Sequence, residues 1–288
     1  MFPIRRILVP VDFSARSVAA AEYASSMAAQ LGAELKIVHV LPPLEYEYSM
    51  VEPVRERQGE IGSERAKRVR EELENIPPKL HPGVNLERLL VEGDPSTEIV
   101  NLTKSERADL VVMPTSGKGS IRRFLLGSVV SKVLHDTECP VWTGVHLESP
   151  TGPFELKHLV CAVDFGPHSH AVLSAALGLA KHFGARVTLV YATPHLGFEA
   201  ADFFDESWRL EMTRMAREQL RKLADDVGGG AELIVEAGDP DKVVSETAKR
   251  VHADLVVIGR GAIASGLGRL RANAYAIIRR SPCAVLSI

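Results

Sequence analysis

The sequence repeats itself, and this internal duplication limits the possible folds more than any other feature. Ile7–Phe13 (ILVPVDF) corresponds to Leu159–Phe165 (LVCAVDF) at an offset of 152 residues. Two further pairs follow in the same order, at offsets of 145 and 144: Gly93-Asp94-Pro95 with Gly238-Asp239-Pro240, and Cys139 with Cys283. Because the matches are collinear and shift only twice, the 288 residues form two similar domains of ordinary size.

Each repeat alternates short apolar runs with amphipathic segments, which is typical of a parallel sheet covered by helices on both faces. The first repeat predicts strands at Arg6–Val11, Leu35–Leu41, Leu86–Val91, Leu110–Met113 and Val141–Val145, and the second follows the same order to Ala284–Ile288. Ser14 is predicted to cap the first helix and Gly32 to end it. We therefore predict an α/β chain with two Rossmann-like domains, residues 1–146 and 155–288, each with a five-stranded parallel sheet.

Two longer helices are predicted between the second and third strands of the repeats. In the first, Glu60–Glu74, the apolar residues Ile61, Val69 and Leu73 are expected to face inward. In the second, Trp208–Leu223, the expected buried face consists of Trp208, Met212, Met215 and Leu223.

Composition argues against several classes of protein. The 34 basic and 37 acidic side chains give a net charge of −3, whereas a broad nucleic-acid surface needs a basic excess. Three cysteines without a CxxC pair do not form a disulfide framework, which fits a reducing cytoplasm. No stretch approaches the roughly 18 apolar residues of a membrane span. We expect a cytoplasmic protein that binds neither nucleic acid nor membrane.

Residues of the first repeat converge where the strands end, which is where ligands bind in open parallel sheets. Asp12 ends the first strand, Val40 ends the second, and residues 114–128 (PTSGKGSIRRFLLGS) follow the fourth. Glycines let backbone N–H groups approach an anion, and a helix opening at Ser128 directs its positive end towards the same place. An ordinary surface loop explains this composition equally well, and the loop is not a Walker A motif.

These segments resemble the universal stress protein family in its tandem two-domain form. The resemblance rests on Ile7–Ser14, Gly93-Asp94-Pro95, the Gly117-x9-Gly127-Ser128 spacing and Cys139-Pro140-Val141. It implies adenine nucleotide alpha hydrolase-like domains whose last strands pair antiparallel, so that the chain forms a pseudo-dimer within itself. A homodimer of the whole chain is left open.

The resemblance also implies an ATP site, with Mg²⁺, in the first domain. Its residues would be Pro10, Asp12 and Val40 at the adenine and ribose end, Thr115, Gly117, Lys118, Gly119 and Ser120 along the phosphates, and Gly127, Ser128 and Val129 closing over them. The family's nucleotide motif is Gly-x2-Gly-x9-Gly followed by Ser or Thr. This chain departs from it at the first glycine, which is Pro114 and lacks an N–H group.

The second domain departs further from the motif. Its loop keeps Gly259, but the second motif glycine falls on Ala262, and Arg271-Ala272 replaces the Gly-Ser pair. We therefore expect this half to have lost ordinary ATP binding. Asp164, Ala192, Gly259 and Gly261 remain as weaker candidates for contacts with a nucleotide.

Three functions remain open at this point. The first is a nucleotide-binding stress-response protein whose ATP occupancy alters a surface that unidentified protein partners recognise. The second is an enzyme that slowly hydrolyses ATP, with or without phosphoryl transfer to itself, although no catalytic residue is identified. The third is an interaction module without a working nucleotide site. His168-x-His170 does not by itself indicate a metal site, and none is predicted.

Overall fold

The computed structural model describes residues 3–43, 58–77, 79–117, 126–144, 147, 152–193, 206–260 and 272–288. It divides into two compact units, one formed by Pro3–Phe154 and the other containing Glu155–Ile288. Phe154, the last residue of the first unit, is buried and packs edge-on against Tyr23 and Trp142, with ring centroids 5.4 and 5.9 Å apart. The chain therefore passes from one unit to the next immediately after a packed aromatic residue.

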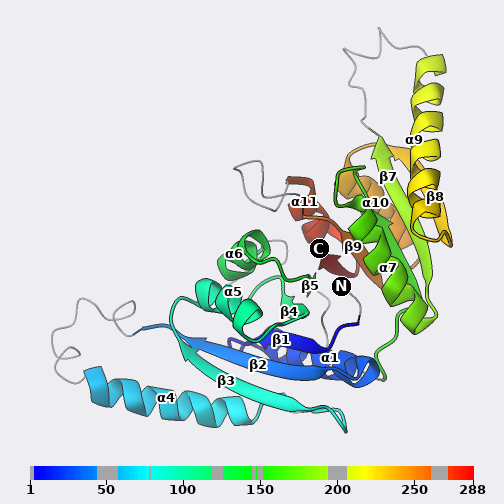
Figure 1. Cartoon of the computed structure of the whole chain (residues 1–288). Helices are drawn as coiled ribbons and strands as arrows, with labels where there is room; N and C mark the ends of the chain where they lie inside the picture. Colours follow the sequence, from blue (N-terminus) through cyan, green and yellow to red (C-terminus); the bar gives the residue numbers. More distant parts are fainter. Residues whose placement is uncertain are drawn as a thin grey trace. The chain divides into compact units, whose positions relative to one another are not determined.

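The first unit contains five parallel strands in the order β3-β2-β1-β4-β5 (Figure 1). The strands are β1 (Arg6–Pro10), β2 (Glu34–Leu41), β3 (Leu86–Glu92), β4 (Leu110–Pro114) and β5 (Val141–Gly144), and the helices are α1 (Ala15–Leu31), α4 (Gln58–Glu74), α5 (Pro95–Ser105) and α6 (Ser128–Asp136). The crossovers through α1 and α4 run outward from β1, whereas the one through α5 returns past it. Right-handed crossovers that reverse direction place their helices on opposite faces of the sheet.

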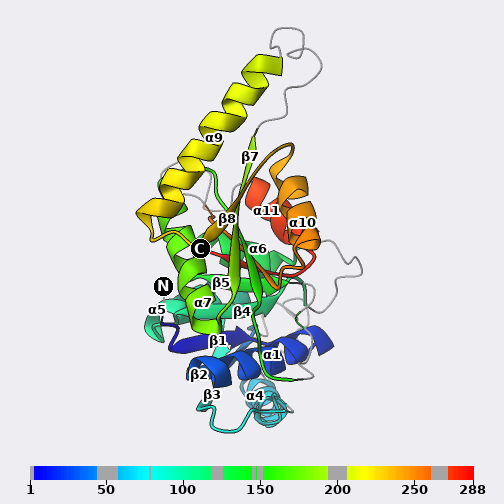
Figure 2. The ribbon, with the colours of Figure 1, turned by 90° about the vertical axis from the view of Figure 1, so that its right-hand side faces the viewer.

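The second unit repeats this topology with the order β8-β7-β6-β9-β10, again all parallel. Its strands are β6 (His158–Ala162), β7 (Arg186–Thr193), β8 (Ala231–Ala237), β9 (Leu255–Ile258) and β10 (Ala284–Ser287), and its helices are α7 (Ser169–Phe183), α9 (Glu206–Asp226), α10 (Pro240–Arg250) and α11 (Ala272–Arg280). Figure 2 shows α7 and α9 on one side of β7 and β8, and α10 and α11 on the other. The predicted fold of two Rossmann-like domains is confirmed.

Local signals in the sequence set the ends of the first helix of each unit. The Ser14 side chain accepts a hydrogen bond from the Ser17 N–H group at 3.2 Å, and Gly32 ends α1 with a φ of 64°. Gly184 ends α7 in the same way, with a φ of 68°. Glycine adopts this left-handed backbone conformation most readily, because it has no Cβ atom. The predicted cap and stop of α1 are thus confirmed.

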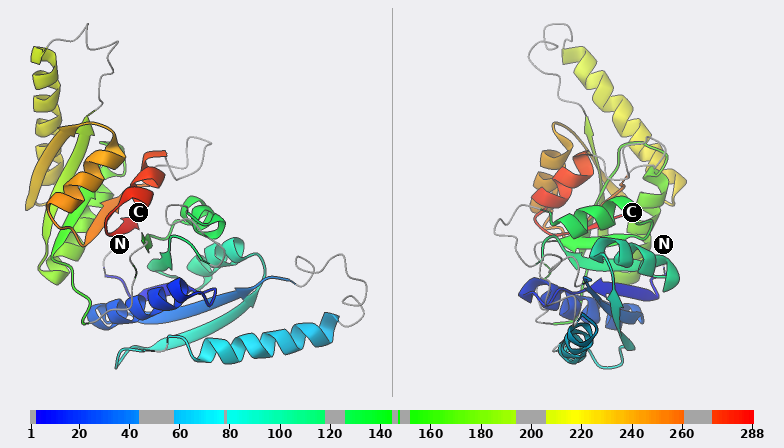
Figure 3. Two further views of the ribbon diagram at one scale, coloured as in Figure 1. Left: turned by 180° about the vertical axis from the view of Figure 1, so that it is seen from behind. Right: turned by 90° about the vertical axis from the view of Figure 1, so that its left-hand side faces the viewer.

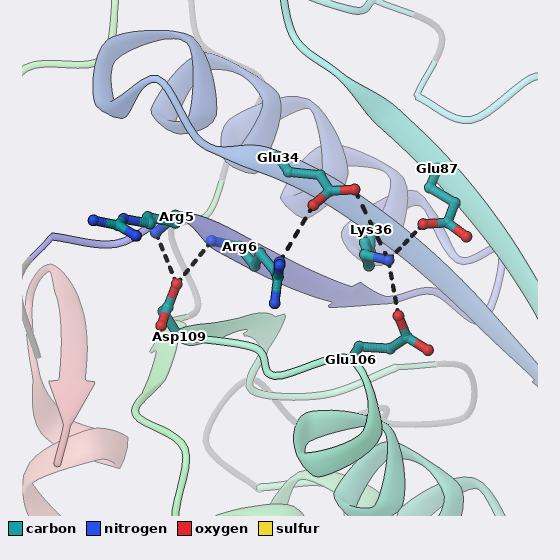
Figure 4. A network of polar contacts seen from close by, with 7 residues as sticks. All are labelled: Arg5, Arg6, Glu34, Lys36, Glu87, Glu106 and Asp109. Carbon is teal, nitrogen blue, oxygen red and sulfur yellow. Dashed lines mark hydrogen bonds and ion pairs between the residues drawn. The ribbon is translucent and has the colours of Figure 1, made fainter.

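A charged network joins the amino ends of the first unit's strands (Figure 4). The Asp109 carboxylate accepts hydrogen bonds from the N–H groups of Arg5 and Arg6, at 2.8 and 3.0 Å. The Lys36 ammonium group lies 2.5 Å from Glu87 and 2.8 Å from Glu106, which raises its pKa through these hydrogen bonds to carboxylates. The network links β1, β2 and β3 at the amino ends of the strands, whereas the ligand site is predicted at their carboxyl ends.

The inward faces expected for the two longer helices are partly wrong. Ile61, Trp208, Met212 and Met215 are 37–46% exposed, whereas Leu73 and Leu223 are buried. Helix α9 has 21 residues, about 31 Å at 1.5 Å per residue, and the seven residues of β8 extend only about 23 Å. The amino-terminal half of α9 therefore extends beyond the strands, as Figures 1 and 3 show, and its apolar residues have no sheet beneath them.

None of the helices in the described ranges combines the length and the apolar composition that crossing a membrane requires.

Candidate functional site

The predicted site of the first unit lies where the direction of the crossovers reverses, between β1 and β4. Asp12 follows β1, and Thr115, Ser116 and Gly117 follow β4, which pairs with β1. A Cβ atom added to Gly117 would overlap Asp12 Oδ2, so the backbone of the loop lies directly against the Asp12 carboxylate. The structure thus brings together two residues that are 105 positions apart in the sequence.

The Asp12 carboxylate is held in place by the start of α1. Its Oδ1 atom accepts hydrogen bonds from the Ser14 N–H group at 3.0 Å and from the Ser14 hydroxyl at 2.6 Å. The Asp12 N–H group donates to the Ser17 hydroxyl at 3.2 Å. Pro10 pairs with Val38 in the neighbouring strand, so Val40 lies level with Asp12. The carboxylate therefore has a fixed position at the carboxyl edge of the sheet.

The two ends of the glycine-bearing loop meet beside α6. The Gly127 N–H group donates to the Thr115 carbonyl at 2.9 Å, and the Gly127 carbonyl accepts from the Ser131 N–H group at 2.9 Å. Ser128, the first residue of α6, is exposed, and Val129 is half-buried. The first N–H groups of a helix have no partner within it and carry a partial positive charge. The amino end of α6 is thus suited to an anion next to the loop.

Two cations lie close to this edge, and neither was among the predicted site residues. The Arg16 guanidinium donates a hydrogen bond to the hydroxyl of Ser116, a buried residue that follows β4 in the chain. Lys132, in the second turn of α6, has its ammonium group 3.4 Å from Asp94 Oδ1. Both residues lie near the beginning of helices that start at the carboxyl ends of strands. That position in the sequence is the signal that would have identified them.

Asp94 follows β3 and caps α5. Its Oδ1 atom accepts hydrogen bonds from the Ser96 hydroxyl at 2.6 Å and from the N–H and hydroxyl groups of Thr97 at 2.9 and 2.7 Å. These hydrogen bonds, chiefly the one from Ser96, hold the pKa of the Asp94 carboxyl far below its usual range. Asp94 therefore carries a negative charge at any pH near neutrality, and Lys132 lies beside that charge.

The second unit has a pocket of about 530 Å³ at the equivalent place. Three of the weaker candidates, Asp164, Ala192 and Gly259, all line it. Its other walls include Ala162, Val163, His168, Ser169, Val172, Val190, Tyr191, Asp239, Val244, Ile258, Asn273 and Ile277. Adding the repeat offset to the residue numbers of the first unit's predicted site gives part of this lining. The sequence did not predict His168, Tyr191, Asp239 or Asn273 as lining residues.

Four predicted residues, Lys118, Gly119, Ser120 and Gly261, lie outside the described residues.

Within the described ranges, no group of three His, Cys, Asp or Glu side chains is placed to hold a metal ion. Mg²⁺ commonly binds through the phosphates of a nucleotide and one or two carboxylates rather than in a cage of protein ligands. The first unit offers one such carboxylate, Asp12, beside the glycine loop. The described residues therefore suit an anionic ligand that carries a bound metal ion with it.

Comparison with known proteins agrees with this architecture. The model of the universal stress protein family matches residues 3–143 and again residues 155–288. A universal stress protein of Methanocaldococcus jannaschii is 31% identical over 144 residues, which cover 48% of this chain and 79% of that protein. One from Mycobacterium tuberculosis H37Rv is 26% identical over 297 residues, covering 97% of this chain and 96% of that protein.

Among solved structures, a universal stress protein from Archaeoglobus fulgidus has the same tandem fold. Its TM-score is 0.70 at 22% sequence identity, and the match covers 99% of this chain and 98% of that one. At this identity, the likeness concerns the fold alone.

Proposed function

Since the chain belongs to the universal stress protein family, we propose that its first unit binds an adenine nucleotide, ATP with Mg²⁺, at the carboxyl ends of β1 and β4. The observation that carries the proposal is the contact between the Gly117 backbone and the Asp12 carboxylate at the point where the crossovers reverse. Ligands of open parallel sheets bind at this point. A universal stress protein of known structure forms a complex with cAMP, another adenine nucleotide.

The arrangement of charge supports an ATP molecule in one orientation. Asp12 lies near the ends of β1 and β2, where its carboxylate can accept hydrogen bonds from ribose hydroxyl groups. Helix α6 begins at Ser128, next to the hydrogen bond between Gly127 and Thr115. The partial positive charge at its amino end would attract the phosphates. Lys132 and Arg16 add positive charge near this side. The base and sugar would thus lie towards β1 and β2, and the phosphates towards α6.

Nucleotide occupancy would then regulate a surface for protein partners. The ligand would bridge β1, the loop after β4 and the start of α6, three segments that are distant in the sequence. Such a ligand shifts the balance between two conformations only to the extent that it binds one of them more tightly. We propose that the ATP-bound form presents the loop after β4 in the conformation that partners recognise.

Calorimetric titration of Mg-ATP into the full chain tests the proposal, after a denatured sample has been checked for nucleotide carried through purification. We expect one equivalent to bind in the first unit and Gly117→Ala to abolish that binding. Gly152→Ala is the matched control, because a Cβ atom there meets open space. GTP tests the preference for adenine. Absence of both binding and carried nucleotide would overturn the proposal.

A further inference from the structure

Arg16 extends from the start of α1 to the residues that follow β4. It is the second residue of α1, and its guanidinium donates a hydrogen bond to the hydroxyl of the buried residue Ser116. Arg16 itself is exposed, and an exposed arginine side chain usually moves among several rotamers. Because Ser116 holds the guanidinium at the carboxyl edge of the sheet, a ligand that binds the guanidinium pays less of this entropic cost.

The equivalent position of the second unit borders a cavity large enough for a ligand. Arg16 corresponds to His168 at the repeat offset of 152 residues, and His168 lines the pocket of about 530 Å³. Asp164, the counterpart of Asp12, lines the same pocket. Since the two units share one strand order, the repeat places Arg16 on the wall of the corresponding space in the first unit.

The chemistry of the Arg16 side chain suits phosphate groups. A guanidinium presents five N–H donors in a planar fork, which matches the oxygens of a phosphate. Within the described part of the chain, it makes one hydrogen bond, to Ser116, and its other N–H groups can therefore serve a ligand. The Asp12 carboxylate at the same edge repels phosphates, and a cation beside it offsets that repulsion.

The sequence changes both partners of this pair in the second repeat. Arg16 corresponds to His168 and Ser116 to Gly261, whereas Asp12 is kept as Asp164. The guanidinium and the hydroxyl that holds it thus occur together in the first repeat and are replaced together in the second. This pattern is expected if the serine serves to position the arginine.

We infer that Arg16 determines the specificity of the first unit for a phosphorylated nucleotide, and that Ser116 is its positioning residue. The guanidinium binds the phosphates while it keeps its hydrogen bond to Ser116, so that the ligand joins the start of α1 to the loop after β4. The adenine part of the ligand rests on the proposed function. The preference for phosphate rests on the guanidinium and its position.

The experiment titrates Mg-ATP and adenosine separately into the full chain and into charge variants. We expect Arg16→Gln to weaken ATP binding about tenfold or more, the loss typical of a hydrogen bond between charged groups, and to leave adenosine binding unchanged. Arg16→Lys keeps the charge but not the planar fork, so its affinity for ATP should lie between those of the original chain and Arg16→Gln.

Lys104→Gln is the matched control. It removes an equal charge from an exposed side chain in the last turn of α5, at the amino ends of the strands. We expect it to change neither affinity. A loss of ATP binding in this variant as large as in Arg16→Gln would show that the net charge of the unit, and not the position of Arg16, governs binding.

Ser116→Ala tests the positioning role with a double-mutant cycle. Without the hydroxyl the guanidinium is no longer held, so ATP binding should weaken in the single variant. In the Arg16→Gln background the same substitution should have no further effect on ATP affinity, because the group that Ser116 positions is already gone. Additive losses would mean that Ser116 acts independently of Arg16.

The inference and the proposed function fail in distinguishable ways. If ATP binds and Arg16→Gln leaves the ratio of ATP to adenosine affinity unchanged, the inference is wrong while the proposed function stands. If neither ATP nor adenosine binds, the proposed function fails, and titration of inorganic pyrophosphate decides the inference. Pyrophosphate binding that Arg16→Gln removes would keep the phosphate role of Arg16, and absence of pyrophosphate binding would overturn it.

Discussion

The backbone of Gly117 packs against the carboxylate of Asp12, so closely that a Cβ atom at residue 117 would lie 3.0 Å from Asp12 Cγ and overlap Oδ2. Its φ lies outside the left-handed region, so the requirement for glycine here comes from this contact and not from backbone strain. The contact joins the end of β1 to the loop after β4. Both the geometry of the proposed ATP site and the local packing therefore depend on one pair of residues.

Gly117→Ala should lower the free energy of unfolding by about 1–3 kcal/mol, the usual cost of an added methyl group in a tightly packed place. Denaturant titration measures it, with Gly152→Ala as the neutral control because nothing lies within 4 Å of a Cβ atom there. In the double variant Asp12→Ala, Gly117→Ala, the overlap is relieved, so the two effects should not add. Additive effects would mean that the loop moves away from Asp12 in solution.

The two acidic helix caps at equivalent places in the repeats should differ in strength. The Asp94 side chain accepts three hydrogen bonds from Ser96 and Thr97, whereas the Asp239 side chain makes no capping hydrogen bond at the start of α10. Asp94→Ala should therefore cost about 1 kcal/mol of unfolding free energy. Asp239→Ala, which removes only an exposed ion pair with Lys242, should cost less than Asp94→Ala. Equal losses in denaturant titrations would contradict the difference between the caps.

The contribution of Asp94 should also depend on pH. Its pKa is lower in the folded chain than in the unfolded chain, so the unfolded state binds more protons in acid. The stabilisation is complete above the unfolded pKa of about 3.9 and is lost as the pH falls towards the folded pKa. The difference in stability between the original chain and Asp94→Ala should thus shrink below about pH 4. A difference that is constant with pH would show that the carboxylate charge plays no part.

His158 should make the second unit sensitive to mild acid. The side chain is buried, its Nε2 atom lies 2.8 Å from the Thr188 hydroxyl, and burial, with the charge of Arg186, lowers its pKa. A histidine with a lowered folded pKa stabilises the fold above its unfolded pKa of about 6.5 and loses that contribution as the pH falls. Thermal unfolding should show His158→Gln losing less stability than the original chain between about pH 7.5 and pH 5.5.

The control for this prediction is His182→Gln, which removes an exposed imidazole from the end of α7. That variant leaves the buried His158 imidazole in place, so the loss of stability attributed to His158 should persist in it. If His158→Gln and His182→Gln show the same slope of stability against pH, burial of His158 is not the source of the acid sensitivity.

The sequence predicts elements well where the signal is local or repeated. Ser14 and Gly32 mark the ends of α1, and the duplication predicts that both units share one strand order, as they do. The resemblance to the family predicts Asp12 and Gly117 as neighbours of one ligand, which stays a prediction, and their direct contact depends on the pairing of β1 with β4. That pairing joins distant residues and leaves no mark in the sequence around either of them.

Other features depend on lengths and on tertiary context. Arg16 contacts Ser116 across 100 positions, so neither residue alone indicates the pair. The lining of the second pocket includes Tyr191 and Asn273, which no nucleotide motif marks. The exposed face of α9 was mispredicted because helical spacing identifies an apolar stripe but does not show where the sheet beneath it ends.

The uneven burial along α9 gives a direct test of this last point. Leu220 is fully buried, so Leu220→Ala should cost about 2–5 kcal/mol of unfolding free energy. Met212, two turns earlier, is 38% exposed, and Met212→Ala should change stability by no more than about 0.5 kcal/mol, because little apolar surface is lost. Denaturant titration of both variants measures the contrast. If Met212→Ala costs as much as Leu220→Ala, the overhanging face is covered in solution. A midpoint that rises with protein concentration would then identify a second copy of the chain as the cover, because association stabilises the folded form by mass action.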